Sequence, residues 1–360
     1  MKTVEAFKEY VASVEARDNY SRPVAFGLGV RKQKGDTTLE VFYPVINFEG
    51  SYGTAAVLQD VLGYEGSSNG YAFSGDGKVH QNIELLESLA TGLEALHRAN
   101  YHTVDVIAYF LFDKDQAVAS AEEGYFKTQC LSQLHVKPHN INVSGIFGKM
   151  NNVAWTNKGP ILPEDIAQER IKWTFIGEEL IVSHVDKFPY LVNFHVPNGV
   201  RIVSGSQVRL GAHLSPGTTV MPAGYINFNA GTLGNAMVEG RISGGVVVGK
   251  DSDLGGGASI MGTLSGGNKN VISIGEKCLL GANAGTGISL GDGCTIAAGV
   301  YVTAAAKVSL YNADKQRANI VKGHELDGKP YLLYLLDSQT GKLIARPNSK
   351  VIELNESLHA

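Results

Sequence analysis

Aliphatic side chains recur in steps of six through the middle of the chain. One register contains, with Thr232 as its only break, Val196, Ile202, Val208, Leu214, Val220, Ile226 and Val238. Glycines occupy a second register, three residues later, at positions 199, 205, 211 and 217. Helices repeat at about 3.6 residues and half-buried strands at about 2, so neither gives this period. A strict six indicates a parallel β-helix, in which each hexad forms one short side of a triangular coil.

The period survives two slips and one interruption. After Val238 the register slips by four and continues through Ile242, Val248, Leu254 and Ile260. The Gly/Ser/Asn-rich segment Gly262–Asn270 is predicted to leave the coil as a loop. The period resumes at Ile274 and Leu280, slips again, and ends with Leu290, Ile296, Val302 and Val308. An ordinary glycine-rich β-sandwich would not keep one inward aliphatic residue per hexad for so long, so we prefer the coil.

The pattern outside the coil is that of helices and ordinary strands. Helices are predicted over Thr3–Arg17, Asn82–Arg98, Ala119–Leu134 and Asp165–Thr174. Strands are predicted over Ala25–Val30, Leu39–Ile46 and Thr103–Phe112, so residues 1–125 form a small α/β domain. Trp155–Ala167 is interpreted as a connection and Phe175–Asn193 as the entry into the coil.

The region after the coil is expected to be a short β extension. Tyr311–Gly323 is polar and is predicted as a loop. Lys329–Leu336 and Lys342–Arg346 are predicted to form a hairpin around Ser338–Gly341, and Val351–Leu354 a last strand.

Composition narrows the function classes. The net charge is -4 and the pI about 6.2, so no general attraction to nucleic acid or to anionic membranes is implied. The three cysteines, Cys130, Cys278 and Cys294, have no CxxC spacing, which favours a reduced, cytoplasmic protein over a disulfide framework or a zinc site. No apolar run reaches the roughly 18–20 residues of a membrane span. Met1–Tyr10 lacks the apolar centre of a signal peptide.

Two other features are weaker candidates for chemistry. Ser74–Val79 contains Gly-Asp-Gly-Lys, but Ala72 stands where a phosphate loop needs its first glycine and Val79 where it needs Ser or Thr, so we predict a plain turn. His213 is the only histidine inside the coil. One histidine cannot build the three-histidine zinc site of a hexapeptide-repeat carbonic anhydrase, so we predict that it is a surface or interface residue.

Three stretches of the coil resemble a known family. They are Asn227–Gly234, Met237–Ser243 and Ser252–Gly267, and the match returns at Glu353–Ala360. They closely resemble the tetrahydrodipicolinate N-succinyltransferases, in the long form of actinobacteria and pseudomonads, with a dense match over about 208–308 and a weak one over the first half. The expected fold is therefore mainly β, with a left-handed parallel β-helix over 196–310. An N-terminal α/β domain with its connection is expected over 1–195, and a short C-terminal β extension over 311–360.

Acyl transfer from a thioester to an amine needs a group that accepts the amine proton or takes the acyl group. Glu239 is the candidate, because it follows the inward Val238 in a stretch poor in charge. On spacing alone, a corner carboxylate paired with Arg241 is the better explanation. The resemblance implies the opposite: the matching Glu is the family's active-site residue, described as forming an acyl anhydride, and the neighbouring Arg contacts succinyl-CoA. The sequence leaves anhydride formation and general-base catalysis both open.

Glycine-rich turns present backbone N–H groups that suit a developing oxyanion. The resemblance implies that Gly262 is this donor and that coenzyme contacts come from Gly256, Ser259, Ala282, Ala297, Ala298 and Ala305, with Lys322 near the CoA phosphates. The family usually has Glu at position 297 and Gly at position 305, so these two alanines are departures. Each residue also has an ordinary explanation, as a coil corner or a solvated lysine.

Two further departures affect the ligands. The long form often holds Mg²⁺ on the trimer axis with acidic residues, but the matching positions here are Ser206 and Ala223, so we predict no metal. The family often has an Arg pair near the C-terminus that meets the coenzyme; Leu335 and Leu336 stand there, so the contact would weaken or come from Lys329 or Lys342.

The resemblance implies a cytoplasmic homotrimeric enzyme with sites at subunit interfaces. It would transfer succinyl from succinyl-CoA to tetrahydrodipicolinate, reacting as its open amino-keto-pimelate form, in diaminopimelate and lysine synthesis. Two alternatives stay open: a hexapeptide-repeat acyltransferase with another amine acceptor or acetyl-CoA as donor, and a non-catalytic β-helical scaffold. The Asn227–Glu239 string opposes the first, and Glu239 with the glycine-rich 255–267 segment opposes the second.

Overall fold

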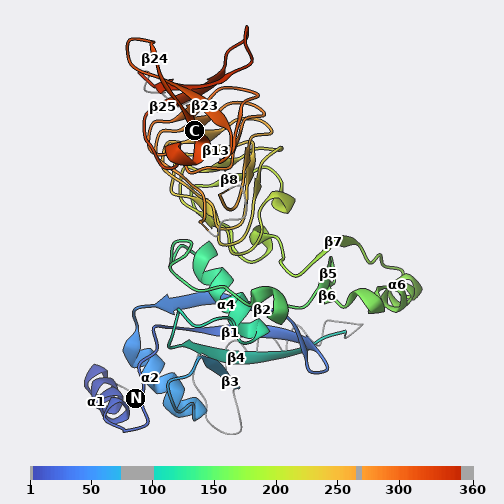
Figure 1. The fold of residues 1–360 in the computed structure, drawn as a ribbon. Coiled ribbons are helices and arrows are strands. Elements are labelled where there is room, and N and C mark those ends of the chain that lie inside the picture. The colour runs from blue at the N-terminus through green and yellow to red at the C-terminus, as the bar shows by residue number, and fades with distance from the viewer. Residues whose placement is uncertain (1–2, 74–100, 265–269, 350–360) are drawn as a thin grey trace. The chain divides into compact units, whose positions relative to one another are not determined.

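The computed structural model describes residues 3–73, 101–264 and 270–349. The chain divides into two compact units, one of residues 1–130 and 140–189, the other of residues 131–139 and 190–360 (Figure 1). Three predictions lie outside the described residues: the Asn82–Arg98 helix, the Ser74–Val79 turn and the Val351–Leu354 strand. Within the described ranges, no helix is both long enough and apolar enough to cross a membrane.

An antiparallel sheet forms the centre of the first unit. Its strand order is β2-β1-β4-β3, with β1 Ala25–Lys34, β2 Thr37–Phe48, β3 Gly70–Phe73 and β4 Thr103–Leu111. The three predicted strands are confirmed, and β3 is additional. Helix α1 (Val4–Glu15), predicted by its apolar stripe, is confirmed.

Two helices cover opposite faces of this sheet (Figure 1). Helix α2 (Tyr52–Leu62), which the pattern did not predict, packs Ala55 and Leu58 against Phe110 of β4. Helix α4 (Ala121–Ser132), which was predicted, packs Phe126 against Tyr109, one residue along β4, with ring centroids 4.8 Å apart. Successive side chains of a strand point to opposite faces, so the sheet is buried on both sides.

A second, three-stranded sheet occupies 153–186. Its order is β6-β5-β7, with β5 Val153–Thr156, β6 Gly159–Ile161 and β7 Val182–Asp186. Nearby lie α5 Ile146–Lys149, η1 Pro163–Asp165 and the predicted helix α6 Ile166–Phe175. The interpretation of 175–193 as coil entry is therefore wrong for β7, which pairs with β5 instead. These strands are too short for a period to show.

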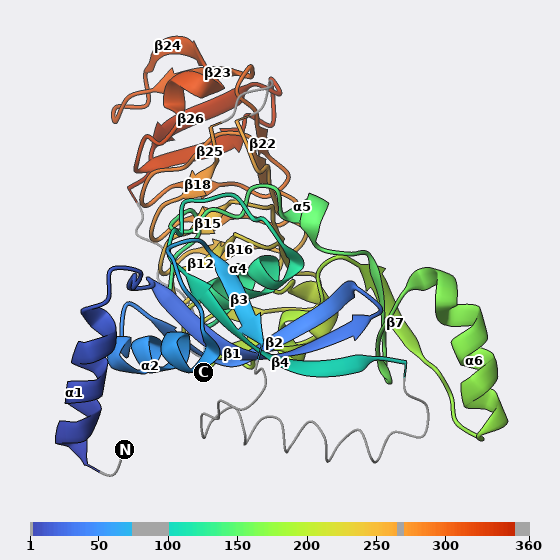
Figure 2. The same cartoon turned by 90° about the horizontal axis from the view of Figure 1, so that it is seen from below.

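The second unit is a prism of three parallel sheets, visible in Figure 2 as a stack of short strands. The first sheet contains β8 Arg201–Ile202, β10 Thr219–Val220, β13 Met237–Val238, β16 Asp253–Leu254, β19 Leu279–Leu280 and β21 Thr295–Ile296. The second contains β11 Tyr225–Ile226, β14 Arg241–Ile242, β17 Ser259–Ile260, β20 Gly285–Thr286 and β22 Tyr301–Val302. The third contains β9 His213–Leu214, β12 Gly231–Thr232, β15 Val247–Val248 and β18 Ser273–Ile274. Two 3-10 turns, η2 Leu191–Asn193 and η3 Gly205–Gln207, lie at its start.

The predicted inward register is the core of this prism. From Val208 to Val308 every residue of the register is at most 3% exposed, including Thr232. Thr232 is tolerated because its hydroxyl lies 2.6 Å from that of Thr218. Val196 was placed on the register but is 78% exposed, because it precedes β8, the edge strand of its sheet.

The register slips are shortened corners. Only three residues separate the inward Val238 from Ile242, and three separate the inward Thr286 from Leu290, where other sides have five. The loop starting at Gly262 adds length without disturbing the pairing, since Ile260 still pairs with Thr286 one coil later. Glu239 therefore lies in a tight turn between two sheets.

Two hairpins follow the last full coil. Strands β25 Leu332–Leu336 and β26 Leu343–Pro347 form the predicted hairpin, and β25 adds in parallel to β21. Strands β23 Lys307–Tyr311 and β24 Arg317–Lys322 form a second hairpin, followed by η4 Gly323–Leu326. The prediction of a loop over Tyr311–Gly323 is wrong, because β24 is exposed on nearly all positions and leaves no alternating pattern.

Candidate active site

The candidate residues are distributed around the sheet of β11, β14, β17, β20 and β22, which we call the middle sheet. Two edges of the prism border it. The Glu239 edge consists of the corners at 239–240, 255–258, 281–284 and 297–300, which precede its strands. The Gly262 edge consists of the corners at 227–229, 243–245, 262–263, 287–289 and 303–306, which follow its strands.

The Glu239 edge is a continuous column held by backbone hydrogen bonds. Gly257 donates its N–H to the Glu239 carbonyl at 3.1 Å, and Asn283 donates to Gly256 at 2.8 Å. Gly299 donates to Ala282 at 2.9 Å. The structure therefore aligns, on one edge, the predicted Glu239, Gly256, Ala282, Ala297 and Ala298. Ala297 is half-buried against the core, and its N–H donates to the Tyr334 carbonyl of β25 at 2.9 Å.

The Glu239 side chain is half-buried at the foot of this column. Oε2 lies 3.6 Å from the point where a Cβ on residue 256 would stand, so glycine there leaves the carboxylate approachable. Among the described residues, no ion pair or hydrogen bond joins the carboxylate to Arg241, which is exposed. The alternative of a corner ion pair with Arg241 therefore has no geometric support.

The outer face of the middle sheet carries a ladder of aligned residues. Strand register places Tyr225, Arg241, Ser259, Gly285 and Tyr301 above one another. Arg241 and Ser259 are thus adjacent, as expected if both contact one coenzyme. Tyr301 was not predicted: it is 45% exposed, and its ring fills the space over Gly285, where a Cβ would stand 2.1 Å from a ring carbon. A glycine at an outward strand position was the sequence signal for this aromatic residue.

Gly262 begins the loop on the other edge. The loop base is closed by a bridge between Thr263 and Val271 and by the Leu264 N–H donating to Asn270 at 2.9 Å. The Gly262 carbonyl accepts from Ile272 at 3.2 Å. Among the described residues, none accepts a hydrogen bond from its N–H.

One chain does not bring Glu239 and Gly262 together. They lie at opposite edges of the middle sheet, and four residues of nearly extended chain span it, or about 13 Å. A single acyl carbon cannot lie within hydrogen-bond reach of both groups in one chain. Ala305 lies on the Gly262 edge, so the predicted coenzyme contacts also divide between the two edges.

The predicted basic contacts are all exposed. Lys322 ends β24 opposite Lys307 of β23, and its backbone N–H donates to Oε1 of Glu325 at 2.8 Å. Lys329 precedes β25 and Lys342 lies in the connection just before β26, and both are exposed. Leu335 is half-buried and Leu336 is 48% exposed. Both side chains are uncharged, so they cannot replace the Arg pair that the resemblance implies at these positions.

His213 is buried within its own chain, so the prediction of a surface or interface residue is wrong. It is 4% exposed, and Nδ1 lies 3.0 Å from the Val136 carbonyl, in the 131–139 segment that belongs to the same unit. Burial lowers its pKa below the ordinary value, so the imidazole is neutral near pH 7. His213 therefore fastens this segment to the coil.

The cysteines are buried and inert. Burial raises the pKa of Cys278 to about 12 and also raises the pKa values of Cys130 and Cys294. Thiolate is the reactive form, so none of the three is a nucleophile at neutral pH.

Ser206 and Ala223, which stand where the resemblance would place acidic metal ligands, are both exposed. Ser206 shares a 2.9 Å contact with Ser204, and Ala223 has no donor atom in its side chain. In the described part of the chain, no group of three or more His, Cys, Asp or Glu side chains is placed to hold a metal.

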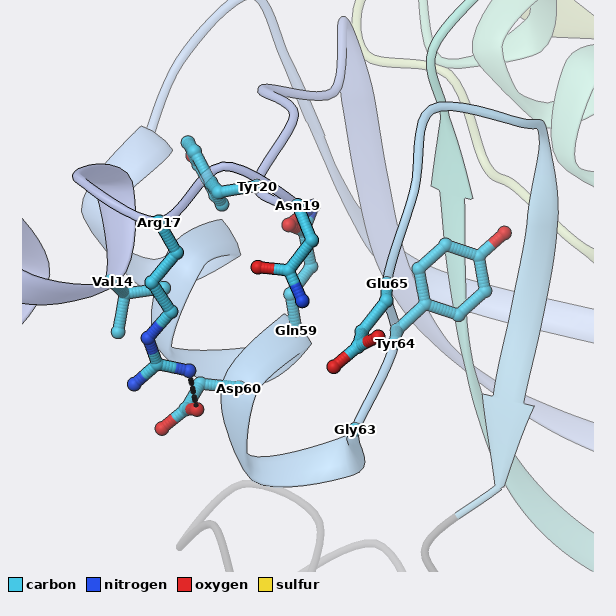
Figure 3. Close-up of a pocket in the computed structure, with 9 residues that line it drawn as sticks. All are labelled: Val14, Arg17, Asn19, Tyr20, Gln59, Asp60, Gly63, Tyr64 and Glu65. Carbon is cyan, nitrogen blue, oxygen red and sulfur yellow. Dashed lines mark hydrogen bonds and ion pairs between the residues drawn. The ribbon is translucent and has the colours of Figure 1, made fainter.

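A polar cavity of about 220 Å³ lies in the first unit, between the ends of α1 and α2 (Figure 3). Its walls include Arg17, Asp60 and Glu65, and Arg17 is paired with Asp60 at 2.5 Å. None of the predicted site residues is among its described lining residues, and Arg17, the one basic residue among them, is paired with Asp60.

Comparisons with known proteins identify the family. The models of the N-terminal and middle regions of tetrahydrodipicolinate N-succinyltransferase match residues 5–69, 67–148 and 150–190, and that of the hexapeptide repeat of succinyl-transferase matches 271–304. A 2,3,4,5-tetrahydropyridine-2,6-dicarboxylate N-succinyltransferase of Pseudomonas paraeruginosa is 44% identical over 94% of this chain and 97% of its own. That of Vibrio cholerae is 44% identical over 93% and 98%.

A solved structure agrees with these relatives. A Campylobacter jejuni protein described as a 2,3,4,5-tetrahydropyridine-2-carboxylate N-succinyltransferase superposes with a TM-score of 0.85 at 34% identity, covering 98% of this chain and 99% of that one. The matches therefore include the first half of the chain, over which the motif resemblance is weak, in addition to the coil. The chain belongs to the tetrahydrodipicolinate N-succinyltransferase family of acyltransferases.

Proposed function

We propose that this chain transfers the succinyl group of succinyl-CoA to the amino group of tetrahydrodipicolinate in its open 2-amino-6-oxopimelate form, in diaminopimelate and lysine synthesis. The observation that carries the proposal is the approachable Glu239 carboxylate at the foot of a column of small residues. A long thioester needs such a column, because side chains larger than alanine would obstruct its pantetheine arm.

The residues have distinct roles in this reaction. The substrate amine attacks the thioester carbonyl and CoA leaves as the thiolate. Glu239 takes the amine proton, or first attacks the thioester and forms an anhydride that the amine then opens. The Gly262 N–H stabilises the oxyanion, and Arg241 with Ser259 binds the donor on the outer face of the middle sheet.

The distance between the two edges supports a trimer with shared sites. If Glu239 and Gly262 act on one acyl group, they come from neighbouring chains whose Glu239 and Gly262 edges face each other across a groove.

We further infer that the coil is left-handed, as expected for hexapeptide repeats. The chain then has three domains, at residues 1–195, 196–310 and 311–360. Three free, buried thiols suit a reducing cytoplasm.

The test is release of CoA, measured with succinyl-CoA and acetyl-CoA crossed against 2-amino-6-oxopimelate, an amino sugar and a simple α-amino acid. Turnover should be highest for succinyl-CoA with the pimelate. Preference for the amino sugar or for acetyl-CoA would instead support a hexapeptide-repeat acyltransferase of another specificity. Absence of turnover with every pair would favour a scaffold.

Light scattering at micromolar concentration should give a trimer mass, unchanged by EDTA. The expectation rests on the divided site and on Ser206 and Ala223, which lack the carboxylates that bind a hard cation. A monomer mass would refute the shared site. Loss of the trimer in EDTA, restored by Mg²⁺, would show that other residues hold a metal.

A further inference from the structure

His139 adopts a backbone conformation that few side chains tolerate. Its φ is +71°, in the left-handed region, directly after the buried Pro138. Non-glycine residues persist there only where their surroundings hold them, and such residues gather at functional sites. His139 belongs to the 131–139 segment that clusters with the coil.

The contacts that hold His139 join two successive corners of the Gly262 edge. Its N–H donates to Oδ1 of Asn229 at 3.2 Å. Its imidazole Nε2 lies 2.6 Å from the Gly245 carbonyl, one coil further on, so Nε2–H is the donor. One residue therefore fastens two coils from outside.

Gly262 occupies the next corner and rests directly on the fastened one. A Cβ at Gly262 would stand 3.1 Å from the Gly244 carbonyl oxygen, the peptide next to the one His139 holds. The far end of the loop rests on the same corner, since a Cβ at Gly245 would stand 3.3 Å from Cγ1 of Val271 and 3.4 Å from Cε1 of His139. The 244–245 peptides thus support both ends of the loop that begins at Gly262.

We propose that His139 is a positioning residue for the Gly262 N–H: its bond to the Gly245 carbonyl fixes the corner that sets the direction of this donor. The inference rests on the oxyanion role proposed for Gly262. Oxyanion donors act only when held at hydrogen-bond distance from the charge that develops in the transition state. A loosened corner should therefore reduce turnover more than binding of the donor.

Two substitutions separate the hydrogen bond from the backbone conformation. His139→Gln places an amide N–H near the position of Nε2, whereas His139→Asn tolerates the left-handed conformation but is too short to reach Gly245. Removal of an oxyanion donor costs about 10²–10³ in kcat, and misalignment should cost less, about tenfold. We expect this loss in His139→Asn with KM for succinyl-CoA nearly unchanged, and recovery of most of it in His139→Gln. His135→Asn, in the same segment, is the control and should match the wild type.

Equal kcat for His139→Asn and the wild type would overturn the inference. Equal losses in the Asn and Gln variants, accompanied by equal losses of melting temperature, would show a purely structural role. If the wild type releases no CoA with any substrate pair, the proposed function fails separately. Amide hydrogen exchange at Gly262 then decides: it should be faster in His139→Asn than in His139→Gln, and equal exchange would refute the positioning role.

Discussion

Glu239→Gln should lower kcat by about 10²–10⁴ while the trimer, the melting temperature and succinyl-CoA binding stay close to those of the wild type. Glutamine keeps the size of the side chain and one acceptor oxygen, so the tight turn after Val238 retains its packing. The amide can neither take a proton at neutral pH nor attack a thioester. Steady-state kinetics and thermal melting on one preparation measure both effects.

The matched control is Glu276→Gln. Glu276 is an exposed carboxylate at a different corner and in a different turn of the same β-helix. The substitution should leave kcat unchanged, because Glu276 lies on neither edge of the middle sheet. If Glu239→Gln keeps wild-type turnover, the carboxylate has no part in the chemistry and attack must be direct, assisted by Gly262 alone. If it lowers only the melting temperature, Glu239 is a structural corner residue.

Leu280→Ala should destabilise the coil by about 2–5 kcal/mol, the usual cost of removing a buried leucine side chain. Leu280 is fully buried and pairs with Leu254 below and Ile296 above. A cavity at this point interrupts the inward stack in mid-coil, and the neighbouring strands are too short to close it. Urea unfolding followed by circular dichroism gives the change in free energy.

Leu279→Ala is the control for this experiment. Leu279 is the other residue of β19, and it is half-buried, with its side chain pointing away from the coil interior. The same atoms are deleted from the same strand, so a much smaller loss of stability is expected. Comparable losses at both positions would mean that the inward stack is not what stabilises the coil.

The sequence predicted the coil well because its signal is periodic and dense. Residues on one register from Val208 to Val308 are buried as expected, and even the slips correspond to real short corners. A second inward position holds small residues: Ala212, Ala230, Cys278 and Ala284 are at most 1% exposed, and each lies two residues before an inward residue of the following strand. Small residues lose little hydrophobic free energy on exposure, so they leave little pattern.

The first unit was predicted less completely. Helix α2 has apolar residues around much of its circumference, so no stripe marks it, and β5 to β7 are too short to show alternation. Pairing between strands that are distant in sequence determines these elements, and a short sequence window carries little information about such pairing.

The site was predictable as residue types but not as an arrangement. The family resemblance grouped Glu239, Gly256 and Ala282 as residues of one site, and the structure aligns them on one edge of the prism. The period could not indicate that Gly262 lies across the middle sheet from them, because this depends on which corner the shortened turn and the loop occupy. The position of His139 at this edge could not be predicted for another reason: its contact with Gly245 joins residues 106 positions apart in the sequence.

The C-terminal hairpins also determine how far the coil can grow. Every coil presents unpaired N–H and C=O groups to the next, so an uncovered end would accept a coil from another molecule. Strand β25 occupies this end of the first sheet, and β26, β23 and β24 then continue it in partly antiparallel fashion. An antiparallel hairpin offers no template for another hexapeptide coil, so the hairpins act as a stop against end-to-end fibre formation.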